Sequence, residues 1–339
     1  MRVAVFDTHA YDRSALMAAN KGLHEFVFVD TRLSIETVEL AKGCRGVSCF
    51  VNDQLGNLVL TRLFALGVRI IALRCAGFSN IDLKAADALG LTVVRVPEYS
   101  PHAVAEHAVA LLLTLVRKTH KAFNRVHESN FTLDGLVGFD IAGKTIGVVG
   151  TGRIGKVFAR ILRGFDANVL AYDTQPDAAW ATENGIRYVP WEELLALSDV
   201  ISLHVPLNDR TWHLVTSGSF DKMKKGVILI NTGRGALVET KALISALKTK
   251  KIGGACLDVY EEEEGVFFSD LSEKGVDDDA LARLTTFPNV LITSHQAFLT
   301  REALANIAET TISSLSAFES NRELGAVKLT RTHRKETTQ

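Results

Sequence analysis

The chain has 339 residues, of which 47% are hydrophobic and 23% are charged, and its formal net charge is −1. This length predicts two domains, and this composition excludes a disordered or low-complexity chain. Because the sequence has 38 basic and 39 acidic side chains, the protein has no net positive charge that would attract phosphate groups. We therefore expect neither a nucleic acid nor a membrane as its partner.

Cysteine usage and apolar run length indicate the compartment. Cys44, Cys49, Cys75 and Cys256 show no CxxC spacing, which predicts free, buried thiols in a reducing environment. The first apolar run ends at Asp7, too early for a signal peptide, and the longest, around 108–116, covers roughly half a membrane span. These features predict a cytoplasmic protein.

Short β-branched runs alternate with amphipathic segments along most of the chain. The first series of expected strands covers 2–6, 26–29, 46–51, 69–73 and 92–96, and the second covers 145–149, 168–172, 200–205, 227–231, 254–257 and 289–293. Strands that alternate with helices form parallel sheets. The sequence therefore predicts an α/β fold with two doubly wound parallel-sheet domains.

A long apolar helix separates the two series. Ser100 is its expected N-cap, Pro101 opens its first turn, and the apolar run continues to Val116 before a basic end. This helix is the natural crossing between the domains. A last helix, about 301–321, follows the final strand, and its pattern alone does not assign it to either domain.

A glycine-rich turn follows the strand at 145–149. Gly150, Gly152 and Gly155 form GxGxxG, and a helical pattern begins directly after them. In this context the first glycine permits a tight turn, the second lets a pyrophosphate approach, and the third allows close helix packing. The helix N-terminus then favours the phosphates, so the motif predicts dinucleotide binding.

The next strand ends in Asp173, 18 residues after Gly155. An acid there would accept hydrogen bonds from the adenosine ribose and repel a 2′-phosphate. No arginine follows it in Thr174-Gln175-Pro176. We therefore predict NAD as the cofactor, in preference to NADP.

Polar side chains follow three later strands of the second series, where ligands of doubly wound sheets bind. Arg234 lies between two glycines after 227–231, Asp258 and an acidic run from 261 to 264 follow 254–257, and His295 follows 289–293. Arginine can grip a carboxylate, histidine can supply a proton, and a carboxylate can orient that histidine. Spacing alone does not show which carboxylate pairs with His295.

Five stretches resemble the D-isomer-specific 2-hydroxyacid dehydrogenases: GKTIGVVGTGRIG, LHVPL, INTGRGALVE, GACLDVYEEE and NVLITSHQAFLT. Two more, ALRCAGFSNIDL and VPEYSPHAVAEHAVAL, are most similar to the fermentative D-lactate dehydrogenases of that family. The resemblance covers nearly the whole chain up to Gly325. It implies a Rossmann NAD-binding domain, residues 100–296, inserted into a flavodoxin-like catalytic domain, residues 1–99 and 297–339.

The resemblance also implies residue roles. It makes Arg234 the substrate-binding residue, His295 the acid/base that protonates pyruvate during hydride transfer from NADH, and Glu263 the partner of that histidine. Further implied cofactor contacts are Arg153, Ile154, Val205, Pro206, Thr211, Thr232, Gly233 and Asp258, and implied substrate contacts are Ala76, Gly77, Tyr99 and Phe298. Gly233 stands where relatives often have Ser and Thr211 where they often have Asn, and we expect only the second difference to weaken a contact.

Other interpretations remain open. The substrate could be a bulkier 2-oxo acid such as phenylpyruvate or 2-oxoisocaproate, or the chain could be an NAD-sensing, co-repressor-like binding protein. His102 and His107 lie five apart and not four, so we predict no metal site. Phe50, Phe78 and Phe298 could line a pocket or fill a core, and the remaining acidic residues of the 261–264 run are expected to be solvated. We expect a homodimer or homotetramer.

Overall fold

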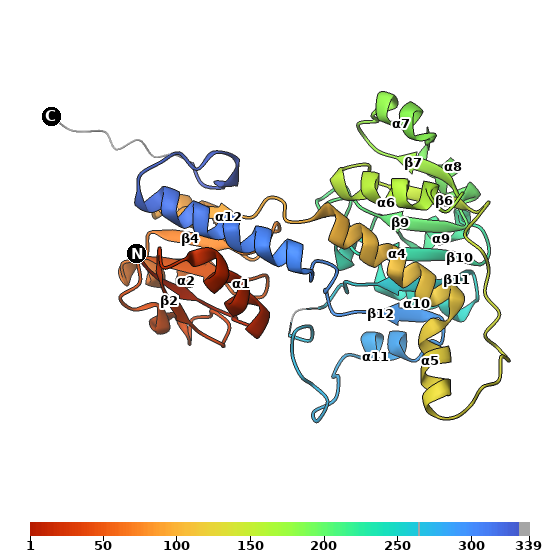
Figure 1. Cartoon of the computed structure of the whole chain (residues 1–339), viewed down its shortest axis with the longest axis horizontal. Coiled ribbons are helices and arrows are strands. Elements are labelled where there is room, and N and C mark those ends of the chain that lie inside the picture. Colours follow the sequence, from red (N-terminus) through yellow and green to blue (C-terminus); the bar gives the residue numbers. More distant parts are fainter. Residues whose placement is uncertain (264, 332–339) are drawn as a thin grey trace. The chain divides into compact units, whose positions relative to one another are not determined.

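In the computed structural model, which describes residues 1–263 and 265–331, the chain forms two compact units (Figure 1). Unit 1 contains Met1–Ser100 together with the residues from Phe298 onward, and unit 2 contains Pro101–Ala297. Each unit has a parallel sheet of its own. The predicted fold class, with two parallel-sheet α/β domains, is confirmed.

Unit 1 is built on a five-stranded sheet with the order β2-β1-β3-β4-β5, which is the flavodoxin-like order. Its strands are β1 (Arg2–Val5), β2 (Glu25–Phe28), β3 (Gly46–Cys49), β4 (Ile70–Leu73) and β5 (Thr92–Arg95). β3 ends two residues before the predicted end. The reason is that the Phe50 backbone N–H donates to the carboxylate of Asp53 and so turns away from the ladder.

Helices cover this sheet, and one of them comes from the far end of the chain. The helical elements are α1 (Ala10–Asn20), η1 (Val38–Ala41), α2 (Asn57–Ala65), α3 (Leu83–Ala88), α12 (Arg301–Glu319) and η3 (Gly325–Val327). α12 packs on α1 and β4, and Ala308 and Leu315 join Val3, Val5 and Ile70 in one core. The apolar face of the last helix therefore belongs to unit 1.

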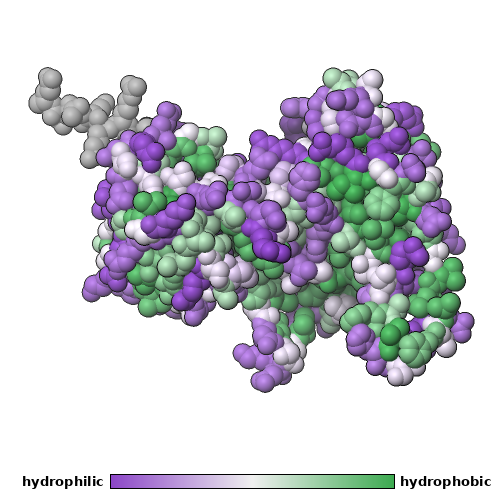
Figure 2. Space-filling model, viewed as in Figure 1, coloured by the Kyte–Doolittle hydropathy of each residue, from purple (hydrophilic) through white to green (hydrophobic). Residues whose placement is uncertain are grey.

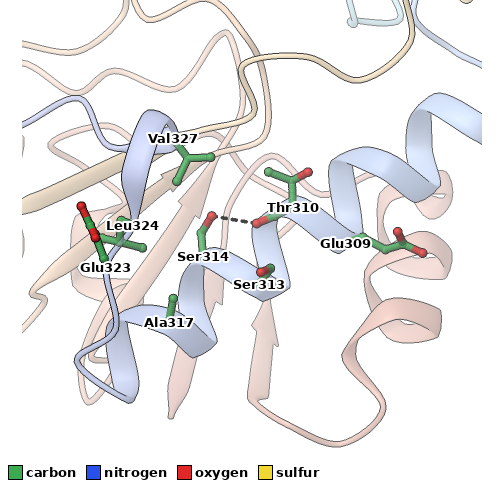
Figure 3. Close-up of a pocket in the computed structure, with 8 residues that line it drawn as sticks. All are labelled: Glu309, Thr310, Ser313, Ser314, Ala317, Glu323, Leu324 and Val327. Carbon is green, nitrogen blue, oxygen red and sulfur yellow. Dashed lines mark hydrogen bonds between the residues drawn. The ribbon is translucent and has the colours of Figure 1, made fainter.

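A shallow pocket lies between α12 and η3 (Figure 3). Ser313 and Ala317 line its helix side, and Leu324 and Val327 line the opposite side. The Ser314 hydroxyl donates to the Thr310 carbonyl within the helix, so this hydroxyl is used locally.

Unit 2 has a seven-stranded parallel sheet with the order β12-β11-β10-β9-β6-β7-β8. The strands are β6 (Thr145–Val149), β7 (Asn168–Tyr172), β8 (Arg187–Tyr188), β9 (Val200–Leu203), β10 (Val227–Asn231), β11 (Ile252–Leu257) and β12 (Val290–Ile292). Counted from β6, this is the order of dinucleotide-binding sheets. The sequence missed β8, because two residues are too few to show a strand pattern.

The helices of unit 2 lie on both faces of its sheet. They are α4 (Pro101–Arg117), α5 (Thr119–His127), α6 (Arg153–Arg163), α7 (Ala178–Asn184), α8 (Trp191–Leu197), α9 (Ser217–Lys222), η2 (Gly235–Leu237), α10 (Thr240–Lys248) and α11 (Asp279–Thr285). α4 packs on α6 and the sheet, where Leu112 and Leu115 contact a core that includes Ile146 and Phe158. The apolar face of α4 is thus buried within its own unit.

The segment from α5 to residue 139 leaves large apolar side chains exposed. Those of Phe131, Leu133 and Val137 are 72%, 78% and 84% exposed, and α5 buries none of its residues. Figure 2 shows green side chains gathered at the lower right, where Figure 1 places α5. We call residues 119–139 the α5 arm.

All four cysteines are buried and form no disulfide, which confirms that part of the prediction. Within the described ranges, none of the helices combines the length and the apolar character needed to span a membrane.

Candidate active site

The glycine-rich turn after β6 has the geometry that a bound pyrophosphate needs. Gly150 has φ +91°, a conformation that favours glycine, and a Cβ on Gly155 would lie 1.9 Å from the Gly150 carbonyl oxygen. A Cβ on Gly152 would instead enter open space. Gly152 is also the N-cap of α6 and provides no capping side chain. The turn therefore leaves room for an anion at a helix N-terminus.

Asp173 lies directly after β7 and is bound to this turn. Its Oδ2 accepts from the backbone N–H of Thr151 at 2.6 Å and from the Thr151 hydroxyl at 3.0 Å, and its Oδ1 accepts from the Gln175 N–H. Partial burial raises the pKa of Asp173, but these hydrogen bonds outweigh burial, so the pKa lies below its usual value. A carboxylate is therefore present at the ribose position of the fingerprint.

Arg234 lies in a tight turn after β10. The Asn231 side chain holds the turn, because its Nδ2 donates to the Arg234 carbonyl and its Oδ1 accepts from the Gly233 N–H. A Cβ on Gly235 would lie 2.0 Å from the backbone of Tyr260, so only glycine fits there. The Arg234 side chain is half-buried, and its guanidinium donates to the Gly233 carbonyl.

Glu263 and His295 form a close pair. Nδ1 of His295 lies 2.8 Å from Oε1 of Glu263, and the two side chains are 17% and 23% exposed. The second carboxylate oxygen accepts from the Tyr260 N–H at 3.1 Å. β10, β11 and β12 are neighbours in the sheet, so Arg234, Glu263 and His295 all follow adjacent strand ends.

Asp258 holds the turn that carries His295. Its side chain is fully buried and accepts from the Thr293 hydroxyl and from the N–H groups of Gln296 and Ala297. Burial raises the pKa of Asp258, but these bonds and one from His107 outweigh it, so the pKa lies below its usual value. His295 itself has φ +54° and donates its N–H to the Asp258 carbonyl.

The comparisons with known proteins agree with this geometry. Residues 109–297 match the family model for the NAD binding domain of D-isomer specific 2-hydroxyacid dehydrogenases. The chain belongs to this family. It is 49% identical over 320 residues to D-lactate dehydrogenase from Escherichia coli strain K12, which covers 94% of this chain and 97% of that protein.

Solved structures of relatives agree with this assignment. The apo-structure of the E. coli D-lactate dehydrogenase superimposes with a TM-score of 0.90 at 47% identity and covers 97% of this chain and 100% of that chain. The pyruvate reductase of Chlamydomonas reinhardtii gives a TM-score of 0.92 at 44% identity over 96% and 98% of the two chains. This 2-hydroxyacid dehydrogenase is thus an NAD-dependent oxidoreductase.

The other residues predicted to contact the cofactor differ in how their polar groups are used. Thr232 follows β10, and its buried hydroxyl has no hydrogen-bond partner among the described residues, which fits a cofactor contact. The Thr211 hydroxyl instead donates to the Pro206 carbonyl within its own turn, next to the half-buried Val205. A Cβ on Gly233 would make ordinary contacts, the nearest at 3.4 Å, which agrees with the expectation that serine is tolerated there.

The acidic run after β11 is less solvated than expected. Glu261 accepts from Nε2 of His213 at 2.5 Å and from the N–H and hydroxyl of Thr240. Partial burial raises the pKa of Glu261, but the hydrogen bonds with His213 and Thr240 lower it by more, so the pKa lies below its usual value. The prediction that Glu261 is solvated is wrong, because sequence distance concealed partners 21 and 48 residues away. Glu264 lies outside the described residues.

Two histidines outside the predicted site make contacts within unit 2. His204 is enclosed beside Phe158 and Ser202, and burial lowers its pKa to about 3. His107 of α4 contacts the Thr293 hydroxyl at 3.0 Å and lies 3.4 Å from the Asp258 carboxylate. The spacing of His107 from His102 bears only on metal binding and gives no sign of these contacts. Among the described residues no group of three or more His, Cys, Asp or Glu side chains could hold a metal.

The predicted substrate residues of unit 1 lie in two places along the chain. Ala76 and Gly77 follow β4, and Tyr99 and Phe298 lie at the end of the first segment of the unit and at the start of the second. The rings of Tyr99 and Phe298 lie 6.2 Å apart edge to face, and Phe50 lies 5.9 Å from Phe298. Phe50 and Phe298 are buried, whereas Phe78 is 39% exposed. Ala76 and Gly77 form a turn whose carbonyls accept from Arg95 and from the Cys75 thiol.

Proposed function

We propose that this dehydrogenase is a D-lactate dehydrogenase that reduces pyruvate with NADH, with Arg234, Glu263 and His295 as its catalytic residues. The observation that carries the proposal is the 2.8 Å contact between His295 and Glu263 on a strand end adjacent to that of Arg234. The names of two relatives, D-lactate dehydrogenase and pyruvate reductase, support the choice of substrate.

Each member of this triad has a distinct task. The planar fork of Arg234 binds the substrate carboxylate and polarises the adjacent carbonyl group. Because Nδ1 of His295 is bound to Glu263, Nε2 is the ring nitrogen that donates a proton to the carbonyl oxygen. Glu263 orients the ring and stabilises its protonated form. NADH, when bound, supplies the hydride that C2 of pyruvate accepts.

The cofactor is held, in this proposal, by the turn from Gly150 to Gly155 and by residues of the other strand ends. The N–H groups of Arg153 and Ile154 bind the pyrophosphate at the start of α6, and Asp173 binds the adenosine ribose. Residues placed closer to the nicotinamide are Val205, Pro206, Thr211, Thr232, Gly233 and Asp258. For Thr232 the support is its unpartnered hydroxyl.

In unit 1 we assign the substrate carboxylate to the backbone N–H groups of Ala76 and Gly77. Within the described part of the chain these two N–H groups donate to no acceptor, while the turn carbonyls are already used. Adjacent free N–H groups form an anion-binding nest. The aromatic rings of Tyr99 and Phe298 then contact the methyl group of pyruvate.

Turnover with a panel of 2-oxo acids tests the function. We expect NADH oxidation with the highest kcat/KM for pyruvate, followed by 2-oxoisocaproate and phenylpyruvate, and oxidation of D-lactate but not of L-lactate. A preference for a bulky 2-oxo acid would keep the family and change the substrate. NADH binding without turnover of any 2-oxo acid would favour the NAD-sensing alternative.

We further propose that a second copy of the chain covers the α5 arm. Its support is the exposed Phe131, Leu133 and Val137 side chains on a segment that also carries both charge signs, so two copies related by a twofold axis can pair them. Light scattering coupled to size exclusion should give a dimer or tetramer. Leu133→Glu with Val137→Glu should reduce the mass, and an unchanged mass would contradict this interface.

A reducing, cytoplasmic location completes the proposal. Four buried cysteines that form no disulfide support it, and burial raises the pKa values of Cys49 and Cys256 above the usual range. Cell fractionation tests it directly, and recovery in an oxidising compartment would contradict it.

A further inference from the structure

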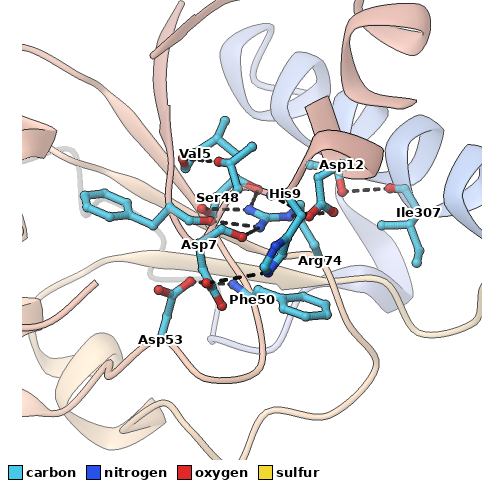
Figure 4. A network of polar contacts seen from close by, with 12 residues as sticks. Val5, Asp7, His9, Asp12, Ser48, Phe50, Asp53, Arg74 and Ile307 are labelled. Carbon is cyan, nitrogen blue, oxygen red and sulfur yellow. Dashed lines mark hydrogen bonds and ion pairs between the residues drawn. The ribbon is translucent and has the colours of Figure 1, made fainter. Parts of the chain in front are cut away.

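A buried arginine directly precedes the Ala76-Gly77 turn. Arg74 follows the last residue of β4, and its side chain is only 1% exposed. Its Nη2 donates to the carbonyls of Phe6 at 2.8 Å and Asp7 at 3.1 Å, and its Nη1 donates to that of Ser48 at 3.1 Å. Figure 4 shows the guanidinium at the centre of this network. Arg74 therefore joins β4 to the carboxyl ends of β1 and β3.

The charge of Arg74 is balanced in place. Oδ1 of Asp12, on α1, lies 3.6 Å from Nε, and the Asp12 side chain is 5% exposed. A buried guanidinium is tolerated only when a counter-charge and hydrogen-bond acceptors surround it. The three carbonyls and Asp12 meet that requirement, so the arginine is fixed by both its charge and its shape.

The backbone around this arginine adopts restrained conformations. Asp7 has φ +47°, and its carbonyl is one of the acceptors of Arg74. The Phe50 ring lies 5.7 Å from the guanidinium carbon, and the Phe50 N–H donates to Asp53 at 2.6 Å. A non-glycine residue keeps a left-handed backbone conformation where the surrounding contacts hold it there. The loops after β1, β3 and β4 are therefore held together by side-chain bonds.

We propose that Arg74 is a positioning residue for substrate binding. It fixes the ends of β1 and β3 against β4, so that the turn after Cys75 presents the Ala76 and Gly77 N–H groups in one orientation to the carboxylate of a 2-oxo acid. This inference rests on the proposed function of that turn. A residue with this role sets the affinity for the carboxylate substrate and leaves the affinity for NADH unchanged.

Arg69 provides a matched control on the same strand. It precedes β4, donates to the carbonyls of Phe64 and Val68, and its guanidinium carbon lies 4.2 Å from the Phe64 ring. Arg69 thus makes the same kinds of contact as Arg74 at the opposite end of β4. Arg69→Gln tests the general cost of losing such an arginine from unit 1.

The experiment compares Arg74→Gln and Arg74→Lys with Arg69→Gln and the natural protein. It measures kcat and KM for pyruvate, the Kd of oxamate in the presence of NADH, and the Kd of NADH alone. Oxamate resembles pyruvate in shape and charge but is not reduced, so its Kd reports binding alone. Circular dichroism and thermal unfolding establish folding, and Arg74→Lys, which keeps the buried charge, serves if Arg74→Gln does not fold.

We expect Arg74→Gln to raise the pyruvate KM and the oxamate Kd by about tenfold or more, with kcat within about threefold and NADH binding unchanged. Arg74→Lys should also raise the pyruvate KM and the oxamate Kd, because lysine has no planar guanidinium group to bridge two strands. Two results would overturn this inference and leave the proposed function intact. One is an unchanged pyruvate KM in folded Arg74 variants, and the other is an equal rise of the pyruvate KM in Arg69→Gln. A natural protein that reduces no 2-oxo acid would overturn the proposed function and this inference with it.

Discussion

Charged side chains gather at the carboxyl ends of parallel strands in both units, but they differ in exposure. In unit 2, His295 and Glu263 are 17% and 23% exposed. In unit 1, Arg74 is 1% exposed and Asp53 is completely buried. Burial raises the pKa of Asp53 to about 6, although the Leu33 and Phe50 N–H groups bind its charged form.

This difference separates two uses of charge. A proton donor must lie within reach of the substrate, and it must be able to lose its proton and regain it in each turnover. A positioning group instead needs partners that hold it in one place, and buried Arg74 has three backbone carbonyls and the Asp12 carboxylate around its guanidinium. Substitutions of His295 and Glu263 should therefore change the chemical step, and substitutions of Arg74 should change substrate affinity.

The largest effect is expected at the proton donor. His295→Gln removes the acid, so kcat for pyruvate reduction should fall on the order of a thousandfold. The Kd of NADH, measured by fluorescence titration, should stay unchanged. A variant that retained most of its kcat would show that another group supplies the proton.

A smaller effect is expected at the substrate clamp. Arg234→Lys keeps the positive charge but loses the planar fork, so the KM for pyruvate should rise and kcat should fall, together about ten- to a hundredfold in kcat/KM. Steady-state kinetics measure this change. Unchanged kinetics would mean that the carboxylate is held by unit 1 alone.

Cofactor choice should shift by about tenfold. The low pKa of Asp173 keeps it ionised at neutral pH, where it repels a 2′-phosphate. Asp173→Ser with Thr174→Arg should weaken the preference for NADH over NADPH, measured as the ratio of kcat/KM values. Equal rates of the natural protein with both cofactors at low concentration would contradict this role.

The smallest effect concerns stability. The pKa of Asp258 is depressed by its hydrogen bonds, so its contribution to the free energy of unfolding is present above the unfolded-state pKa of about 3.9 and is lost as the pH falls through the folded-state pKa. Asp258→Asn should cost about 1 to 2 kcal/mol in urea unfolding at pH 7, and the difference from the natural protein should shrink in acid.

Asp199→Asn is the control for this variant. Asp199 also has a depressed pKa, because bonds from Lys224 and the Thr145 N–H outweigh partial burial, but it lies away from the His295 turn. Both variants should lose stability, whereas only Asp258→Asn should lower kcat. Equal kcat values in the two variants would contradict the anchoring role of Asp258.

The sequence predicted the elements that have a local signal. Repeated β-branched runs marked eleven of the twelve strands in the described residues closely enough to give both sheets, with shifted ends at β3, β9 and β11, and the glycine motif located the glycine-rich turn after β6. β8 was missed because it has two residues. Spacing could not pair Glu263 with His295 across 32 residues, and it gave no sign of the Arg74 network, whose acceptors are backbone carbonyls far away in the chain.

The pH dependence of Glu263→Gln tests the central claim most directly, because glutamine keeps the shape of the side chain and removes its charge. If Glu263 stabilises protonated His295, the alkaline limb of the kcat/KM profile for pyruvate reduction must move to lower pH, and activity should partly recover in acid. His295→Gln should abolish that limb. A Glu263→Gln profile with its limb unmoved and only its height reduced would contradict the account and remove Glu263 as the partner of the proton donor.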